Sequence, residues 1–194
     1  MTVPPERLQR WLAGFTERHG QTQTGYADQL VTLTAADGSV AEVEVPFPPL
    51  TGDLVEHALR TRTVGVLLVR LGGYAAGVFE DGRLTSSKVG SRQVHGRSAA
   101  GGWSQQRFAR RREGQASVAL QSAADVAVRI LLAQPLEAVV VGGERTAVDA
   151  VLADRRLSPL RPLVTGRLLD VPDPRLTVLQ KAPYRDLWIK VREP

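Results

Sequence analysis

The spacing of apolar residues predicts a helix and a hairpin at the start of the chain. Apolar residues recur every three or four positions over 4–19, which indicates an amphipathic helix, and Gly20 suits its end. Two runs of alternating apolar residues follow, at 29–34 and 40–45. The segment 36–38 between them contains Asp-Gly, which is typical of the turn of a β-hairpin.

A short helix over 51–59, with Thr51 as its N-cap, completes this N-terminal part. We therefore predict that residues 1–60 form an extension of helix and hairpin that packs on a larger domain, residues 61–194. The total length of 194 residues suits one domain with a modest appendage.

Three strand-like runs open the larger domain. The run 63–71 is strongly apolar, and glycine turns connect it to 74–79 and then to a third run from 83 toward 97. Tight turns between consecutive strands predict an antiparallel meander. The third run is rich in Ser, Thr, Lys and Arg, which is typical of an edge strand or a protruding arm.

A long helix and then alternating strands and helices fill the remainder. From 104 to about 133 the chain has helical apolar spacing, and Pro135 ends this helix. The later segments are predicted as strand 136–141, helix 144–152, strand 163–169, helix 175–180 and strand 187–191. The predicted fold class is α/β, a mixed sheet with an antiparallel meander and packed helices.

Composition excludes several kinds of chemistry. The chain has no cysteine, so disulfides, thiolate zinc sites and cysteine nucleophiles are excluded. His19, His57 and His95 lie far apart and have no partner at metal-ligand spacing, so we predict neither a metal nor a cofactor. The N-terminus lacks the apolar core of a signal peptide, and no run reaches the roughly 20 apolar residues of a membrane span. We expect a cytoplasmic protein that does not bind a membrane.

The positive charge is concentrated in one segment. The formal net charge is +5, a mild indication of a polyanionic partner. Between residues 88 and 112 there is no acidic residue, and the segment carries seven cations: Lys88, Arg92, Arg97, Arg107, Arg110, Arg111 and Arg112. The basic surface is therefore local.

A glycine loop lies inside this basic segment. Gly101 and Gly102 allow backbone conformations closed to other residues and permit close approach to a ligand. Ser104 can cap the helix that starts with Gln105 and Gln106, and the free N–H groups of that helix end favour a nearby anion.

Arg107, Arg110 and Arg111 fall on one face of this helix, while Phe108 falls on another and is expected to anchor it. A glycine loop on a basic arm suits insertion into a cavity lined by phosphates. A plain glycine turn before a solvated helix has the same spacing, so spacing alone does not separate the two interpretations.

The run GGWSQQRFARRR, preceded by KVGSRQVHGR, resembles the catalytic segment of the class-one release-factor middle-domain superfamily. There, a Gly-Gly-Gln loop precedes a helix rich in Arg, Phe and Ala. The chain is more similar to the Vms-like release factor (VLRF) family, in particular its short actinobacterial branch, whose members carry Gly-x-x-Gln. Gly102-Trp103-Ser104-Gln105 fits this spacing, and segments 74–79 and 139–144 also look like the family. The resemblance covers roughly residues 62–194.

The resemblance implies a release-factor middle-domain-like fold and a peptidyl-tRNA hydrolase that acts in ribosome-associated quality control. Such a protein cleaves the ester between nascent peptide and tRNA inside the large ribosomal subunit. Gln105 would orient the water, Gly101, Gly102, Trp103, Ser104 and Gln106 would contact the substrate, and Arg97, Arg107, Arg110 and Arg111 would hold RNA. A neutral glutamine can orient water without a shifted pKa. Release would be codon-independent, because residues 1–60 show no codon-reading motif. We expect a monomer that binds peptidyl-tRNA and no DNA.

Several alternatives stay open. Trp103 stands where the release-factor motif has glutamine, so it either stacks on a base or ribose or packs the loop against the body. Gln106 is a rival to Gln105, and Gly114-Gln115 is a weaker one inside the helix. A non-catalytic ribosome- or RNA-binding factor would use the same loop and helix for docking.

Other candidate sites are weaker. The turn in 139–144 lacks a complete phosphate-binding motif, so a structural turn is favoured. A metal-dependent nuclease would need clustered carboxylates. The candidate carboxylates are scattered along the chain: Asp125, Asp149, Asp154, Asp170 and Asp173.

Overall fold

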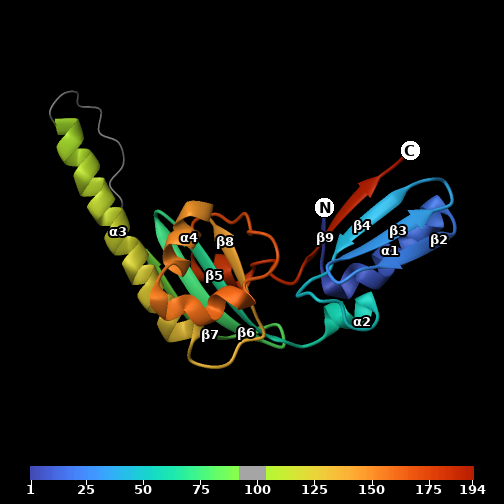
Figure 1. Ribbon diagram of the computed structural model, residues 1–194, viewed down its shortest axis with the longest axis horizontal. Coiled ribbons are helices and arrows are strands. Elements are labelled where there is room, and N and C mark those ends of the chain that lie inside the picture. Colours follow the sequence, from blue (N-terminus) through green and yellow to red (C-terminus); the bar gives the residue numbers. More distant parts are fainter. Residues whose placement is uncertain (92–103) are drawn as a thin grey trace. The chain divides into compact units, whose positions relative to one another are not determined.

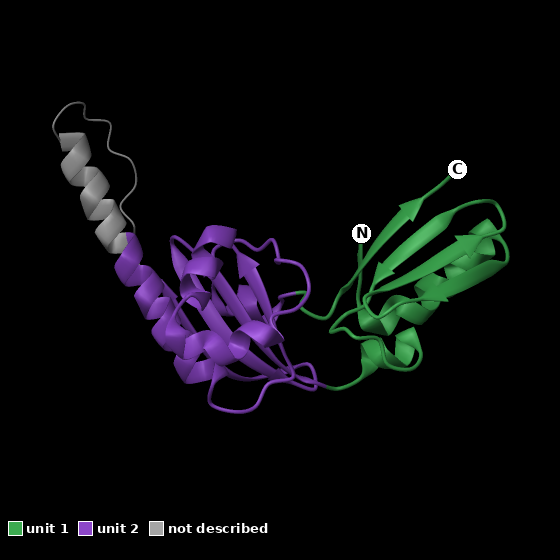
Figure 2. Cartoon of the chain, viewed as in Figure 1, with its two compact units in different colours: residues 1–61, 183–194 green, residues 62–182 purple. Residues whose placement is uncertain are grey.

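The computed structural model describes the backbone of residues 1–91 and 104–194, and the side chains of 1–91 and 116–194. The chain forms two compact units (Figure 2). The first unit combines Met1–Thr61 with Pro183–Pro194, and the second is Arg62–Ala182. The sequence placed all of 61–194 in one domain; in the structure the last twelve residues belong to the first unit instead. Each unit has its own apolar core, so the first is more than a modest appendage.

The first unit is a five-stranded antiparallel sheet with helices on one face (Figure 1). The strands, in spatial order, are β1 (Thr2–Val3), β9 (Leu187–Arg192), β4 (Val40–Glu44), β3 (Leu30–Ala35) and β2 (Thr22–Tyr26). The helices are α1 (Pro5–His19) and α2 (Leu54–Leu59). Leu8 and Phe15 of α1 are fully buried against Val43 and Ile189 in the same apolar cluster.

Most of the local predictions for this unit are confirmed. Helix α1 ends at Gly20, whose φ of +86° lies in the left-handed region that glycine tolerates. Strands β3 and β4 form the predicted hairpin, with Thr34 opposite Val40. The predicted N-cap of α2 is wrong. Asp53 caps it, because its Oδ1 accepts the backbone N–H of Val55 at 2.8 Å.

The second unit is a four-stranded mixed sheet covered on both faces. Its strands, in spatial order, are β7 (Arg83–Ser91), β6 (Gly73–Glu80), β5 (Thr63–Arg70) and β8 (Ala138–Gly143). Strands β5, β6 and β7 form the predicted antiparallel meander, and β8 lies parallel to β5. The helices are α3 (Ser104–Leu131), α4 (Arg145–Leu152), the 3-10 helix η1 (Arg155–Leu163) and α5 (Leu176–Gln180).

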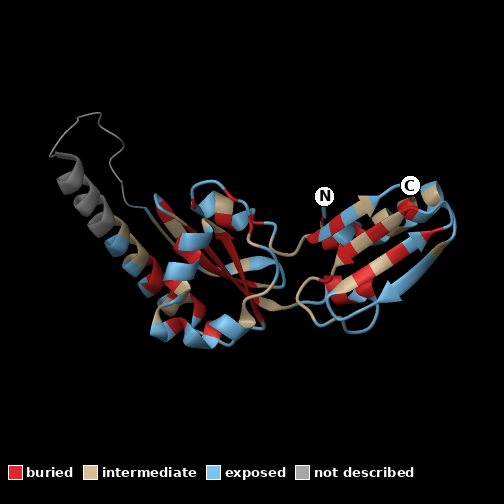
Figure 3. Cartoon of the chain, turned by 45° about the horizontal axis from the view of Figure 1, so that its top comes forward, coloured by how far each residue is buried: buried red, intermediate tan, exposed pale blue. Residues whose placement is uncertain are grey.

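The two central strands of this sheet, β5 and β6, are buried along almost their whole length (Figure 3). On one face, Leu67 and Val78 pack in one cluster with Ala127 and Leu131 of α3. On the other face α5 lies close to the sheet, because Gly77 has no side chain: a Cβ there would lie 2.9 Å from Leu179 Cδ2. The run 63–71 forms β5, the strongly apolar strand that was predicted, and the structure places it in the middle of the sheet.

Two segments differ from the sequence prediction. Residues 163–169 do not form a regular strand; η1 occupies 155–163, and only isolated bridges, including Gly142 to Leu169, follow it. Gly166, in the middle of the predicted strand, has a φ of +76°, which is outside the extended region that a regular strand requires. Strand β2 was not predicted, because its residues are polar and its formation depends on pairing with β3.

Candidate functional site

The segment that carries the predicted site connects β7 to α3. Four of the predicted residues, Arg97, Gly101, Gly102 and Trp103, lie outside the described residues. The other six lie in the first turns of α3, where only the backbone is described: Ser104, Gln105, Gln106, Arg107, Arg110 and Arg111. Helix α3 begins at Ser104, the position where the sequence placed the helix start.

Helix α3 is held to the sheet by its C-terminal part. It has 28 residues, about 42 Å at 1.5 Å per residue. Among its described side chains, from Ala116 onward, the buried ones lie between Ala123 and Leu131, and Val118 is 46% exposed. Gln105 precedes Ala123, the first buried residue among those described, by about 27 Å of helix. The candidate catalytic position is remote from the core of its own unit.

Strand β7, which precedes the segment that carries the predicted site, lies at one edge of the sheet. None of its residues is buried, and its register against β6 is interrupted by a bulge between Val78 and Phe79. This is the polar edge strand that the sequence predicted. Near its end, Tyr74 of β6 occupies the space where Gly90 would carry a side chain. The Tyr74 ring thus packs where β7 leaves the sheet.

An arginine clamp joins α3 to η1. Arg156 Nη2 donates to Asp125 of α3 and to Asp154, both at 2.7 Å, and the backbone N–H of Arg156 donates to Asp154 at 2.9 Å. The Arg156 side chain and then its backbone N–H lower the pKa of Asp154 to about 2. The same guanidinium, and then the Gln121 amide, lower the pKa of Asp125. The clamp is a further contact that fixes α3 on its domain.

Sequence reasoning missed this clamp. Asp125 and Asp154 were regarded as two scattered carboxylates, and Arg156 is 31 residues from Asp125. Only the tertiary fold brings the three side chains together. Among the described residues, no group of three His, Asp or Glu side chains could hold a metal ion.

The turn after β8 is structural, as the sequence favoured. Gly143 has a φ of +102°, and a Cβ there would collide with the carbonyl of Val69. Glu144 lies 3.7 Å from Arg70, whose Nη1 also donates to the carbonyl of Val171 at 2.8 Å. The turn therefore carries a carboxylate beside an arginine that is already paired, which does not favour a phosphate.

His57, the one buried histidine of the described residues, has a structural role. Its Nδ1 accepts the backbone N–H of Thr51 at 3.2 Å, so its Nε2 carries the proton and donates to the carbonyl of Pro46 at 2.8 Å. These contacts tie the start of α2 to the end of β4. Neither ring nitrogen is left for chemistry.

The two units differ in the sign of their net charge. The second unit carries 18 Lys and Arg against 10 Asp and Glu, a formal net charge of +8. The first carries 7 against 10, a net charge of −3. Seven of the cations of the second unit lie between residues 88 and 112. In the searched part of the structure, no helix is both long and apolar enough to cross a bilayer.

Comparison with known proteins identifies the family. The sequence profile of the "Actinobacteria/chloroflexi VLRF1 release factor" family matches residues 62–192, which begins at the first residue of the second unit. The crystal structure of an archaeal translation termination factor, aRF1, aligns with a TM-score of 0.48 and 16% identity. That alignment covers 93% of this chain and 61% of the archaeal factor. No curated protein matches the chain. Because the profile match spans well over half of the chain, the protein belongs to the Actinobacteria/chloroflexi VLRF1 release factor family.

Proposed function

We propose that the protein hydrolyses the ester bond of peptidyl-tRNA on the large ribosomal subunit. One observation carries the proposal: in a chain of a release-factor family, Ser104 and Gln105 of the Gly-x-x-Gln sequence are the first two residues of α3. Release would be independent of a stop codon and would act on stalled or split ribosomal complexes. The protein would act as a monomer in the cytoplasm.

The reaction requires little from the protein itself. An ester is an activated electrophile, so a side chain that orients one water molecule toward the carbonyl carbon can provide most of the rate. Gln105 would do this through its neutral amide or backbone N–H, and Gly101 and Gly102 would let the backbone approach the tRNA end. The ester C–O bond breaks, water supplies the hydroxyl of the released peptide, and the tRNA ribose oxygen takes the proton.

The shape of the second unit supports this proposal. Gln105 precedes the buried part of α3 by about 27 Å of helix, so the N-terminal turns of α3 can enter a narrow cavity of a large partner. Arg97, Arg107, Arg110 and Arg111 supply cations for the phosphates that line such a cavity. The ion pair of Arg156 with Asp125 and the buried residues between Ala123 and Leu131 would hold the C-terminal part of α3 while its N-terminal end binds the ribosome.

The direct test is peptide release from ribosomes that carry a labelled peptidyl-tRNA. We expect Gln105→Ala to lower the rate of release by on the order of 10²–10³. Gln106→Ala, its neighbour on the same helix turn, is the matched control and should stay within a few-fold of the wild type. If wild type releases no peptide, or Gln105→Ala releases as much, the proposal fails. A large loss in Gln106→Ala alone would move the role to Gln106.

A non-catalytic docking factor is the second candidate, and one observation favours it. Trp103 occupies the position directly after Gly-Gly, where the release-factor motif has its glutamine. A docking factor would bind ribosomes without release, and Gln105→Ala would leave sedimentation with ribosomes unchanged. Stacking of Trp103 on a base would then contribute to affinity.

A further inference from the structure

The sheet of the first unit ends in a strand with a free edge. Among the described residues, β2 pairs only with β3. The ladder is bracketed by bonds from Ala27 N–H to the carbonyl of Leu30 and from Ala36 N–H to the carbonyl of Gln21. Backbone groups in an antiparallel pair alternate in direction. The backbone N–H and C=O groups of Gln23 and Gly25 therefore point toward β3. The same groups of the three even-numbered residues point away from the sheet: Thr22, Thr24 and Tyr26.

This edge has none of the usual protection. Exposed edge strands commonly carry Lys, Pro or a bulge that prevents pairing with another chain. Strand β2, with the sequence TQTGY, has no charged residue and no proline, and its register against β3 is uninterrupted. One edge strand of the second unit, β7, has both a bulge and Lys88. One edge is blocked and the other is open.

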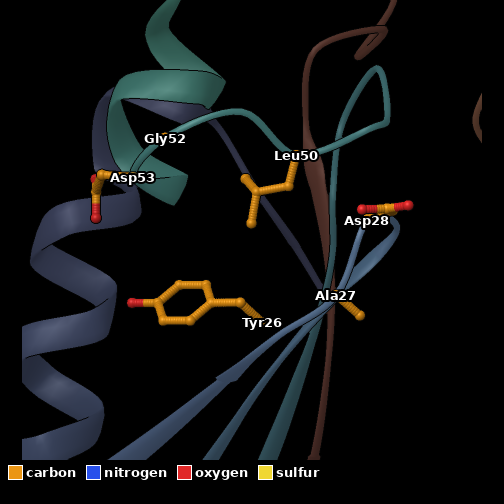
Figure 4. A pocket seen from close by; sticks show the side chains of 6 residues that line it. All are labelled: Tyr26, Ala27, Asp28, Leu50, Gly52 and Asp53. Carbon is orange, nitrogen blue, oxygen red and sulfur yellow. The ribbon is translucent and has the colours of Figure 1, made fainter.

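The side chains of Thr22, Thr24 and Tyr26 also line a groove. Their side chains lie on the helix face of the sheet, where they and Leu12, Ala13 and Leu54 surround a hollow of about 260 Å³. A second hollow of about 450 Å³ adjoins it, lined by Tyr26, Ala27, Asp28, Leu50, Gly52 and Asp53. Figure 4 shows the Tyr26 side chain pointing away from Asp28 and toward the helices. Tyr26 lines both hollows and is 63% exposed.

The charge around this groove selects the partner. Asp28 and Asp53 are the charged residues that line the two hollows, among the described residues, and neither hollow is lined by Lys or Arg. The unit as a whole carries −3. This negative charge disfavours the binding of RNA. It also disfavours pairing with the same edge of a second copy of the chain, because like charges would meet. A cationic chain has the complementary charge.

We propose that β2 binds an extended, basic segment of a partner protein as an additional strand. The outward backbone groups of Thr22, Thr24 and Tyr26 would form the new ladder. Alternate apolar side chains of the segment would enter the groove, and its Lys or Arg side chains would lie near Asp28 and Asp53. This interaction is independent of the proposed hydrolysis, because β2 belongs to the unit that does not carry Gln105.

The test uses the full chain and two synthetic heptapeptides, one alternating Lys and Val and the other alternating Glu and Val. We expect the Lys peptide to bind the β2 edge at least tenfold more tightly, as measured by the peptide concentration that slows amide exchange in β2; binding of the Glu peptide to the basic second unit leaves β2 unchanged. On binding, amide hydrogen exchange should slow at Thr22, Thr24 and Tyr26, whose N–H groups face outward. Gln23 and Gly25, already bonded to β3, should change little and serve as the internal control.

Substitutions separate backbone pairing from charge. Thr24→Pro removes an outward N–H and leaves the β3 ladder intact, so binding should fall at least tenfold. Thr24→Val keeps that N–H and should bind within about twofold of wild type. Asp28→Asn with Asp53→Asn should weaken binding several-fold and reduce its salt dependence, while Asn still caps α2.

Three results would overturn the proposal. Equal binding of the two peptides would remove the charge selection, and unchanged exchange at Thr22, Thr24 and Tyr26 would remove strand addition. Self-association abolished by Thr24→Pro would identify a second copy as the occupant. Peptide release should be the same in Thr24→Pro and wild type, so this proposal and the hydrolase proposal can fail separately.

Discussion

The two units have similar architectures but net charges of opposite sign. Both place helices on a β-sheet and bury a separate apolar cluster. The second unit has a net charge of +8 with seven cations between residues 88 and 112, whereas the first has a net charge of −3. A polyanion is attracted to one surface and repelled by the other. The proposed recognition of RNA and the proposed recognition of a basic protein segment would thus use different units of one chain.

The edge strands β7 and β2, one from each unit, differ in the same way. β7 is polar, interrupted by a bulge and continued by the basic segment, so it suits phosphates better than another strand. β2 is regular and uncharged beside an apolar groove, so it suits a peptide backbone. If both proposals hold, exposure alone does not define an interaction surface. The register and charge of the strand decide what can bind there.

The largest effect should come from charge reversal on α3. We expect a triple change to Glu, at Arg107, Arg110 and Arg111, to weaken ribosome association at 0.1 M salt by about 100-fold or more. It should also lower the slope of log affinity against log salt concentration by about 3 in magnitude. The matched control changes three exposed arginines of α1, namely Arg7, Arg10 and Arg18, to Glu. This control alters net charge equally and should stay within threefold. Sedimentation with ribosomes measures both; equal losses would contradict the separation of charge between units.

Core truncation tests whether the two units are energetically separate. Phe15→Ala should destabilise the first unit by about 3–5 kcal/mol, and Leu131→Ala the second by about 2–5 kcal/mol, because both side chains are fully buried in different clusters. Amide hydrogen exchange, assigned by unit, measures each loss. Loss of protection in both units from either substitution would show that the two cores unfold together.

A pair of glycine substitutions should change stability in opposite directions. Gly77→Ala in β6 would place a Cβ 2.7 Å from Leu84 Cδ1 and 2.9 Å from Leu179 Cδ2, so we expect a loss of about 1–3 kcal/mol. Gly14→Ala in the middle of α1 meets no atom within 4 Å and should stabilise its unit by about 0.8–1 kcal/mol. Urea unfolding measures both, and a stabilising Gly77→Ala would show that α5 can move off the sheet.

The smallest effect concerns the arginine clamp. The folded-state pKa of Asp154, about 2, lies below its usual value of 3.8, so its carboxylate stabilises the fold above about pH 4 and this contribution disappears as pH falls through 2. Asp154→Asn should therefore lower Tm by no more than a few degrees at pH 7, because the Arg156 side chain is 46% exposed and solvent screens the pair, and by almost nothing near pH 2. A difference that persists at pH 2 would contradict the assignment to charge.

Elements defined by local pattern were predictable from the sequence. The amphipathic spacing before Gly20, the Asp37-Gly38 turn, the meander and the start of α3 at Ser104 all follow from side chains within a few residues of each other. Strand β2 escaped prediction because Thr22–Tyr26 is polar and becomes a strand only beside β3. Asp53 replaced Thr51 as the cap because α2 starts at Leu54.

The candidate site divides in the same way. The sequence singled out Gln105 and the arginines after it, because a glycine pair before a basic helix is a local pattern. It could not place the clamp of Arg156 on Asp125, or the ring of Tyr74 over Gly90, because both contacts join residues on different elements.

By itself, then, the sequence determined the helices, the meander, the concentration of charge and the family resemblance. The tertiary structure decided that β9 joins the first unit, where it pairs with β4, so that Glu42 lies opposite Lys190. Apolar periodicity is a property of neighbouring residues and is visible in the chain. Strand pairing between distant segments depends on which edges and apolar faces remain uncovered after the local elements have formed, and only the complete fold specifies them.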